Sequence, residues 1–335
     1  MTSSRIEYID IAKGILIFFL CFHHFPQAVN QVGLPEGDYT LVYFTYKFYA
    51  CYFMQAFFFI TGFCTNFNLD FKSFLTKNIK SLIIPALCFD IITRVFDSIY
   101  APKDICGVFN FRLGFWFLWT LFFCKFINYA LIRRNQRTAM LVFTTIIALV
   151  MIRFATFLNF HFGDEGNWFF NQNVLVMFFF LHLGNVARIF KEKYTKFIPI
   201  GGCMFLLLFF LNLVIGLKMP YVTARIGDLD RAYIPHYLAF ALTGTMFVLF
   251  ISKFIKTNSL LEDVGKHSLL IYGFHFIILK TFVVFLSNVL NFSTLTPVNT
   301  IVFFLVSCTL TFITSYFFSV LVANTRWLSF LTGKW

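Results

Sequence analysis

Ionisable side chains share one face of the first apolar segment of the chain. Lys13 and His24 are 11 residues apart, which is three helical turns plus about 20°, so the two side chains lie on one face about 16 Å apart along the axis. Asp10 falls about 40° from that face, whereas His23 points about 80° away from Lys13. A buried imidazole can act as a general base or as a nucleophile, and a lysine can bind an anion. The alternative is that Asp10 and Lys13 lie at the membrane interface and that His24 hydrogen-bonds to a neighbouring helix.

A second imidazole lies deep in a late apolar segment. His275 follows His267, and the region between them is apolar apart from Ser268 and Tyr272. A single deep histidine is more often a packed residue, but two on separate segments favour a catalytic centre. The chain has no HExxH motif and no evident carboxylate partner for the pair, so no metal site is predicted.

Composition identifies the elements that must position these groups. Of the 335 residues, 59% are hydrophobic, 21% aromatic and only 13% charged, whereas a soluble domain carries about 25% charged residues. The net charge of +12 comes from short basic clusters between apolar stretches, with no basic arm or zinc-finger spacing for nucleic acid. The eight cysteines are scattered and form no disulfide framework. The composition therefore predicts an all-α polytopic membrane protein.

The hydrophobic pattern predicts about ten transmembrane helices, each needing about 20 apolar residues. They cover residues 9–29, 41–66, 81–101, 114–132, 138–158, 174–190, 197–217, 233–252, 267–290 and 299–323. The connections are short, so residues 1–335 are predicted to form one domain. With a cytoplasmic N-terminus, 16 of the 27 Lys and Arg residues fall on the cytoplasmic side, five outside and six within spans. This bias places both termini in the cytoplasm of a multi-pass protein of the cell (inner) membrane.

Five short motifs occur along the chain in a fixed order. They are Arg5-Ile-Glu-Tyr-Ile-Asp10-Ile-Ala-Lys13-Gly14 leading to His24, Phe57-Phe-Phe-Ile-Thr61-Gly62-Phe63, Lys77-Asn-Ile-Lys80 before Pro85, Trp116-Phe-Leu-Trp119, and Gly265-Lys-His-Ser268-Leu-Leu-Ile-Tyr272-Gly-Phe-His275. Together they resemble the motifs of the acyltransferase type 3 family of integral-membrane acyltransferases. Lys13, Lys77 and Lys80 replace arginines of that pattern, and Thr61 replaces a serine. Lysine lacks the planar fork with which arginine binds phosphate. Gly62 is most simply a site of close helix contact.

The resemblance implies an enzyme that takes an acyl group, most commonly acetyl, from acyl-coenzyme A and transfers it to a hydroxyl of an envelope sugar or glycolipid. Acyl-coenzyme A would be a co-substrate, with no permanently bound cofactor. Lys13, Lys77 and Lys80 would hold its phosphates, with Asp10 beside Lys13, although Lys77 and Lys80 also fit ordinary positive-inside charge. His24 would be the base or nucleophile, and His275 would polarise the thioester carbonyl or orient His24.

Two predicted outer loops are candidates for acceptor binding. The loop 159–173 contains Asp164, Glu165 and Trp168, and the loop 218–232 contains Arg225. Sugars often contact such mixtures of aromatic and charged groups, although ordinary solvated loops look the same. Within the third predicted span, Asp90 and Arg94 are four residues apart and are expected to neutralise each other.

The rival class is a transporter or flippase of a lipid-linked glycan or other small molecule. Such proteins commonly contain inverted repeats with broken helices, and no convincing repeat relates the halves of this chain. The partners expected of the enzyme are the lipid bilayer, acyl-coenzyme A and a carbohydrate or glycolipid acceptor, without nucleic acid. The sequence is compatible with a monomer or a homodimer.

Overall fold

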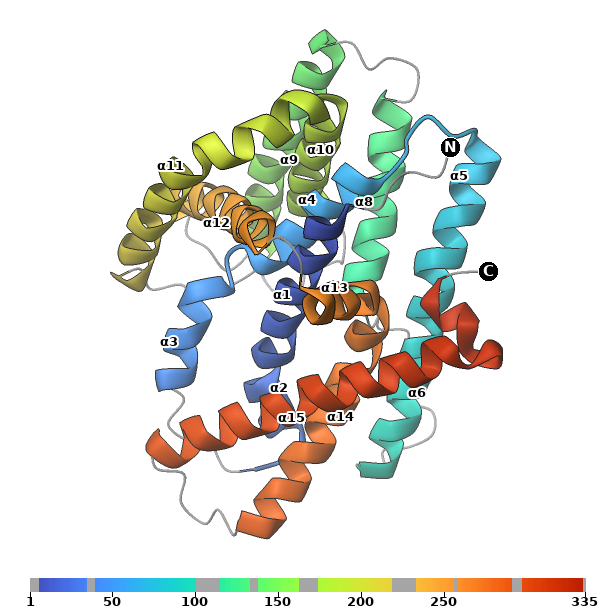
Figure 1. The fold of residues 1–335 in the computed structure, drawn as a ribbon, viewed down its shortest axis with the longest axis vertical. Coiled ribbons are helices and arrows are strands. Elements are labelled where there is room, and N and C mark those ends of the chain that lie inside the picture. Colours follow the sequence, from blue (N-terminus) through green and yellow to red (C-terminus); the bar gives the residue numbers. More distant parts are fainter. Residues whose placement is uncertain are drawn as a thin grey trace. The chain divides into compact units, whose positions relative to one another are not determined.

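The computed structural model describes residues 6–34, 40–100, 115–132, 138–162, 174–218, 233–255, 258–290 and 297–333. These residues are helical and include no strand, which confirms the predicted all-α class (Figure 1). The helices are α1 (Glu7–His23), α2 (Phe25–Gln31), α3 (Thr40–Tyr49), α4 (Phe53–Cys64), α5 (Phe71–Asn78), the π-helix η1 (Ile79–Ile83), α6 (Ile84–Tyr100), α8 (Trp116–Ile132), α9 (Thr138–Phe162), α10 (Leu175–Ile189), α11 (Lys191–Lys218), α12 (Ile234–Phe254), α13 (Ser259–Lys266), α14 (Ser268–Leu290), α15 (Pro297–Asn324) and the 3-10 helix η6 (Arg326–Thr332).

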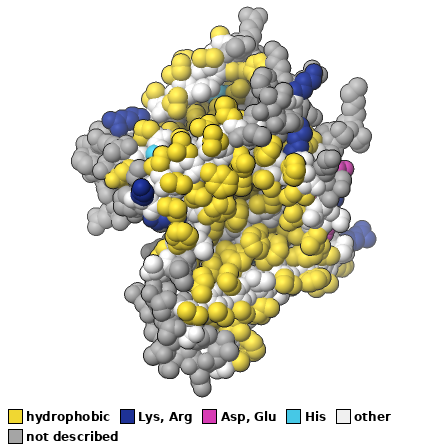
Figure 2. Space-filling view, turned by 60° about the vertical axis from the view of Figure 1, so that its left-hand side comes forward, with side chains coloured by type: hydrophobic (Ala, Val, Ile, Leu, Met, Phe, Trp, Pro, Cys, Tyr) yellow, Lys and Arg dark blue, Asp and Glu magenta, His cyan; other side chains and the backbone are white. Residues whose placement is uncertain are grey.

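Several of these helices have the length and composition of membrane spans. Four stretches meet both criteria, namely Glu7–Gln31, Ile234–Phe254, Ser268–Val289 and Val298–Asn324. Four shorter apolar helices coincide with further predicted segments, namely Trp116–Ile132, Ala139–Phe154, Leu175–Ile189 and Met204–Lys218. Hydrophobic side chains also dominate the face drawn in Figure 2. The chain is therefore a membrane protein, and ten spans with two cytoplasmic termini stay a prediction.

The second predicted span is not one continuous helix. Residues 41–66 form α3 and α4, with a turn between them. The Tyr52 amide donates to the Tyr49 carbonyl, three residues back, at 3.1 Å. This tightened turn ends one helix before the next begins, because the regular bond to the fourth preceding residue is replaced.

The chain divides into two compact units. The first unit comprises Met1–Tyr46, Lys80–Phe115 and Thr257–Trp335, and the second comprises Lys47–Ile79 and Trp116–Lys256. The motifs that contain Lys13 and His275 lie in the first unit, whereas Phe57–Phe63 and Trp116–Trp119 lie in the second.

The first unit is built around the contact between α1 and α13. A Cβ atom on Gly265 would overlap the carbonyl oxygen of Asp10, and one on Gly14 would overlap that of Leu261. The two backbones can approach this closely only because both residues are glycine. Asn258 begins α13, since its side chain accepts a hydrogen bond from the Leu261 amide at 3.0 Å.

Helix α6 packs beside α14 in the same unit. The Phe89 ring fills the space that a side chain on Gly273 would need, and it lies 5.4 Å from the Phe274 ring between centroids. The π-helix η1 precedes α6 directly, at the position where Pro85 removes an amide hydrogen from the helical ladder.

The second unit contains an equivalent close contact between α4 and α10. A Cβ on Gly62 would overlap the Leu181 carbonyl oxygen, and one on Gly184 would overlap that of Phe59. The role predicted for Gly62 is confirmed. At the start of α5, the Asp70 side chain accepts a hydrogen bond from the Ser73 amide at 3.0 Å, and bonds from Ser73 lower the pKa of this exposed carboxyl.

Candidate active site

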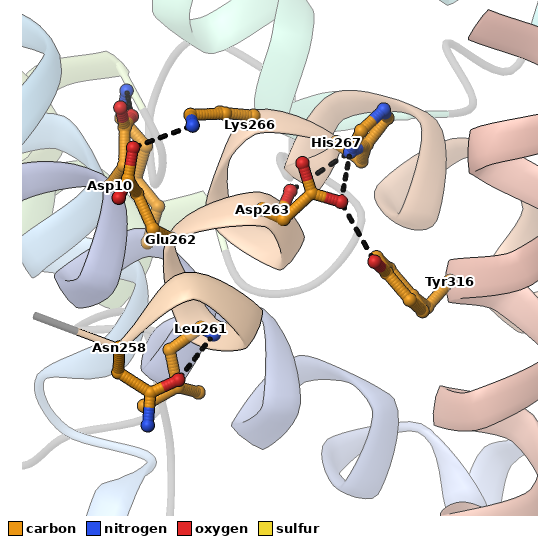
Figure 3. Close-up of polar contacts among 9 residues, drawn as sticks. Asp10, Asn258, Leu261, Glu262, Asp263, Lys266, His267 and Tyr316 are labelled. Carbon is orange, nitrogen blue, oxygen red and sulfur yellow. Dashed lines mark hydrogen bonds and ion pairs between the residues drawn. The ribbon is translucent and has the colours of Figure 1, made fainter. Parts of the chain in front are cut away.

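The N-terminal part of α1 carries an ion pair. Lys13 Nζ lies 3.1 Å from Asp10 Oδ1, and the Asp10 side chain is only 4% exposed, against 27% for Lys13. Because the Asp10 backbone packs on Gly265, the neighbouring residues of α13 reach the same place. Lys266 pairs there with Glu262 at 2.5 Å (Figure 3). Two lysines of α1 and α13, each balanced by a carboxylate, therefore lie near the start of α1.

A second polar group lies where α13 meets α14. His267 caps the C-terminal end of α13, and its Nδ1 donates a hydrogen bond to the Asp263 carbonyl at 2.9 Å. The Tyr316 hydroxyl of α15 donates to Asp263 Oδ2 at 2.7 Å (Figure 3). These bonds fix the junction between α13 and α14, so that α14 leaves α13 in a defined direction.

The other end of α1 is broken at His24. Pro26 has no amide hydrogen and its ring clashes with the carbonyl four residues earlier, so α1 ends at His23 and α2 begins at Phe25. The Tyr46 hydroxyl donates to the carbonyls of Phe22 and His23, at 3.1 and 2.9 Å. The break therefore places His24 on a turn whose carbonyl groups are bonded by a residue of α3.

The adjacent histidines at the end of α1 contact different neighbours. The His23 ring lies against Tyr46, with centroids 5.1 Å apart. The His24 ring lies against His275 and Phe276 of α14, at 5.2 and 5.5 Å. The structure thus brings together the two histidines that the sequence singled out.

Hydrogen bonds assign the tautomers of this pair. His24 Nδ1 lies 2.9 Å from Gln27 Oε1, and an amide oxygen can only accept, so Nδ1 carries the proton and Nε2 the lone pair. His275 Nδ1 likewise donates to the Tyr272 carbonyl at 2.8 Å. Its Nε2 is therefore a hydrogen-bond acceptor.

His275 is buried, with 3% of its surface exposed. Its Nε2 has no hydrogen-bond partner in the described part of the chain. A buried polar atom without a partner costs free energy and calls for an explanation. An acceptor nitrogen beside a second imidazole is suited to receive a proton donor, such as a substrate hydroxyl or a protonated His24.

The motif residues around His275 have supporting positions. Tyr272 is 8% exposed, and its ring stacks near His275 with centroids 6.0 Å apart. Ser268 is half-buried in the first turn of α14. Lys80 lies on η1 in the first unit and is exposed.

Three further motif residues and one lysine lie in the second unit. Lys77 is exposed at the end of α5, Thr61 is half-buried on α4 beside the buried Gly62, and Trp116 begins α8 half-buried. The predicted acceptor residues lie outside the described residues: Asp164, Glu165, Trp168 and Arg225.

Sequence reasoning missed Gln27 and Tyr46, which contact His24 and its turn. Pro26, two residues after His24, is the signal that could have revealed the break. It also missed the pairing of Lys280 with Asp97, although two ionisable residues inside predicted spans are themselves a signal. Within the described ranges, no group of three or more His, Cys, Asp or Glu side chains is placed to hold a metal ion.

Comparison with known protein families gives a match over nearly the whole chain. The family model for the acyltransferase 3 family, described as an acyltransferase domain, matches residues 6–320, nearly the whole chain. No curated protein and no solved structure matches it.

Proposed function

The chain belongs to the acyltransferase 3 family, and on that premise we propose that it transfers an acyl group, acetyl in the first instance, from acyl-coenzyme A to a hydroxyl of a cell-envelope sugar or glycolipid. The coarser statement, that it is a membrane acyltransferase, follows from the family and from the apolar helices. The observation that carries the proposal is the buried, unpartnered Nε2 of His275 next to the His24 ring.

His24 is the proposed base or nucleophile. As a base, its Nε2 takes the proton of the acceptor hydroxyl while that oxygen forms a bond to the thioester carbonyl carbon. The carbon–sulfur bond then breaks, and the coenzyme A thiolate leaves with the electron pair. As a nucleophile, Nε2 attacks the same carbon first and passes the acyl group on. Gln27 supports both roles by keeping the proton on Nδ1.

His275 is proposed to accept a hydrogen bond. With its proton donated to the Tyr272 carbonyl, it has no N–H to offer a thioester carbonyl. This favours the orienting role over the polarising role. Its Nε2 would accept from the protonated His24 or from the bound hydroxyl, and so stabilise the charge that forms during transfer.

The donor is proposed to bind at the opposite end of α1. Lys13, with Lys80 and Lys77, would contact the phosphates of acyl-coenzyme A on the cytoplasmic side of the cell membrane. Asp10 pairs with Lys13 at 3.1 Å, so its proposed role is to aim that ammonium group. Since Lys13 and His24 are 11 residues apart, or about 16 Å of helix, a pantetheine arm would reach from one to the other.

The test uses the full chain, purified and placed in lipid nanodiscs. Release of the coenzyme A thiol from acetyl-CoA, with and without an envelope extract from cells that lack the chain, measures the reaction. Mass spectrometry of glycans from those cells identifies the missing acyl group. Thiol release that depends on His24 supports the proposal. No donor binding, no thiol release and unchanged glycans would overturn it and favour a flippase.

A further inference from the structure

Helices α6 and α14 of the first unit are joined by an ion pair that the proposed chemistry does not use. Lys280 Nζ of α14 bonds to Asp97 Oδ1 of α6. The lysine is 4% exposed, whereas the Asp97 side chain is 47% exposed. Ionisable groups within membrane helices are costly, and by default they mark a functional site.

This ion pair lies close to the histidines. Lys280 follows His275 by five residues, or about 7.5 Å along the helix axis. Its Nζ lies 5.0 Å from the centroid of the Phe276 ring, and that ring lies 5.5 Å from His24. One aromatic side chain therefore separates the ammonium group from the candidate base.

The ion pair also lies on the far side of the histidines from Lys13. Helices α1 and α14 run in the same direction, because α13, just before α14, packs near Asp10 while His24 meets His275. Helix α6 runs in the same direction as α14, since the earlier residues Phe89 and Gly273 are in contact and the later residues Asp97 and Lys280 form a pair. Along this direction come Lys13, then the two histidines, then Lys280 with Asp97.

The chemistry of the pair indicates its ligand. The buried ammonium of Lys280 bonds to one oxygen of the Asp97 carboxylate. The carboxylate is half-exposed and retains acceptor capacity for a further hydrogen bond. A carboxylate accepts hydrogen bonds from hydroxyl groups and repels anions. The neighbouring Phe276 adds an apolar ring of the kind that packs against the carbon–hydrogen face of a sugar.

We propose that Asp97 binds the hydroxyl-bearing acceptor next to His24, as an uncharged polyhydroxylated group such as a sugar ring, and that Lys280 positions the Asp97 carboxylate. The inference rests on the proposed acyl transfer. It adds the site and the charge preference of the acceptor.

A purely structural ion pair is the competing account, and the chain offers a matched control. Asp90 pairs with Arg94 on the same helix at 2.8 Å. Asp90→Asn removes one charge from an α6 ion pair, as Asp97→Asn does. The double variant Asp97→Lys with Lys280→Asp keeps an ion pair between α6 and α14 but reverses its polarity.

The experiment measures two quantities on each purified variant in nanodiscs. The first is the Kd for acetyl-CoA. The second is the transfer of radiolabelled acetyl to an envelope extract from cells lacking the chain, at increasing amounts of extract. Asp97→Asn should keep the Kd within about twofold and lower transfer at limiting extract by about 10- to 100-fold, the range for a lost hydrogen bond to a charged group. Excess extract should restore much of this loss.

The control and the double variant separate binding from structure. Asp90→Asn should transfer acetyl within about twofold of the wild type, as expected for a substitution outside the site. The double variant should be thermally more stable than Asp97→Asn, because it keeps an ion pair, but it should not regain acetyl transfer. The inference is overturned if Asp97→Asn transfers normally, if it loses donor affinity in parallel, or if the double variant regains transfer. A wild-type protein that neither binds acetyl-CoA nor transfers acetyl contradicts the proposed function itself.

Discussion

Two buried histidines, one in each unit, show how differently the fold treats the same side chain. His182 of α10 has both ring nitrogens near partners: Nδ1 lies 2.9 Å from Asn128 Oδ1, and Nε2 lies 3.2 Å from the Leu141 carbonyl. His275 of α14 is also buried, and Nδ1 donates to the Tyr272 carbonyl, but Nε2 has no bond within the described residues. Burial by itself therefore does not distinguish a reactive histidine from a structural one.

The difference lies in what each histidine holds in place. His182 joins three helices of the second unit, since Asn128 belongs to α8 and Leu141 to α9. His275 uses one nitrogen to fix its orientation within α14 and leaves the other next to His24. An acceptor oxygen lies beside each nitrogen of His182, and a neutral ring can donate to one of them. Nε2 of His275 belongs to a ring that lies beside a second imidazole, and it has no bond within the described residues. This contrast supports the role proposed for His275 and a structural role for His182.

The largest expected effect is that of His24→Ala. General-base assistance is typically worth about 10²- to 10⁴-fold, so transfer should fall by that order while the protein stays inserted and folded. The measurement is specific activity of protein purified in detergent, per molecule that elutes as a folded species in size-exclusion chromatography.

His23→Ala is the matched control for His24. His23 packs on Tyr46, whereas His24 packs on His275, so replacement of His23 should reduce activity much less. Wild-type activity in His24→Ala, or a protein inactivated only by His23→Ala, would show that the wrong histidine has been assigned.

The next effect tests the comparison of the two buried histidines directly. His275→Ala should lower specific activity by about 10- to 100-fold, because its Nε2 is the proposed acceptor. It should cost less stability than His182→Ala, because the bond that it loses lies within α14. His182→Ala should lower stability by about 1–3 kcal/mol, from the lost hydrogen bond of a buried side chain that joins three helices, and leave specific activity near normal. Thermal unfolding and acetyl transfer are measured on both variants. Equal losses of stability and of activity in the two variants would contradict the distinction between a reactive and a structural histidine.

The sequence was sufficient for features that depend on spacing within one segment. The all-helical class, the Asp90–Arg94 pair and the close contact at Gly62 are confirmed. Each follows from a local rule: hydrophobic composition, two charges four residues apart, or a small residue on an apolar helix. The pairing of His24 with His275 was anticipated only as two deep histidines that could belong to one centre.

Features that depend on the packing of distant segments were not predicted. Asp97 and Lys280 are 183 residues apart, and both were visible as charges without a known partner. The bonds from Tyr46 to Phe22 and His23 also need the tertiary structure, because α3 must fold back on the end of α1. The break within residues 41–66 could not be predicted from a proline, because this segment contains none.

A smaller effect is expected at Lys13, and it tests whether a residue with a partner can still bind a substrate. Lys13 is paired with Asp10, as His182 is paired with Asn128. If Lys13 also contacts a phosphate, Lys13→Ala should weaken acetyl-CoA binding by roughly 3- to 10-fold, as expected for a partly exposed charge. Lys13→Arg should bind at least as tightly as the wild type, because the fork engages two oxygens. Isothermal titration measures both, with Lys77→Ala combined with Lys80→Ala as a second arm. An unchanged Kd in the neutralised variants would limit Lys13 to a structural ion pair.

The smallest effect is expected from Gln27→Glu, which changes the partner of His24 without removing it. The carboxylate accepts the same bond from Nδ1 and stabilises the protonated ring, so the ring keeps its proton to higher pH. Because the proposed reaction needs neutral His24, the acid limb of the pH–rate profile should move to higher pH. At pH 7 the rate should fall by only about threefold, and it should recover fully in more alkaline buffer.

Gln31→Glu is the control for this change, since it adds the same charge at the end of the same short helix α2. Its pH–rate profile should match that of the wild type. If both variants shift the profile equally, the effect is one of general charge, and Gln27 does not set the state of His24. If Gln27→Glu alone moves the acid limb, the group that titrates is the ring bonded to Gln27. His24 then differs from His182 in function, because its protonation controls the rate.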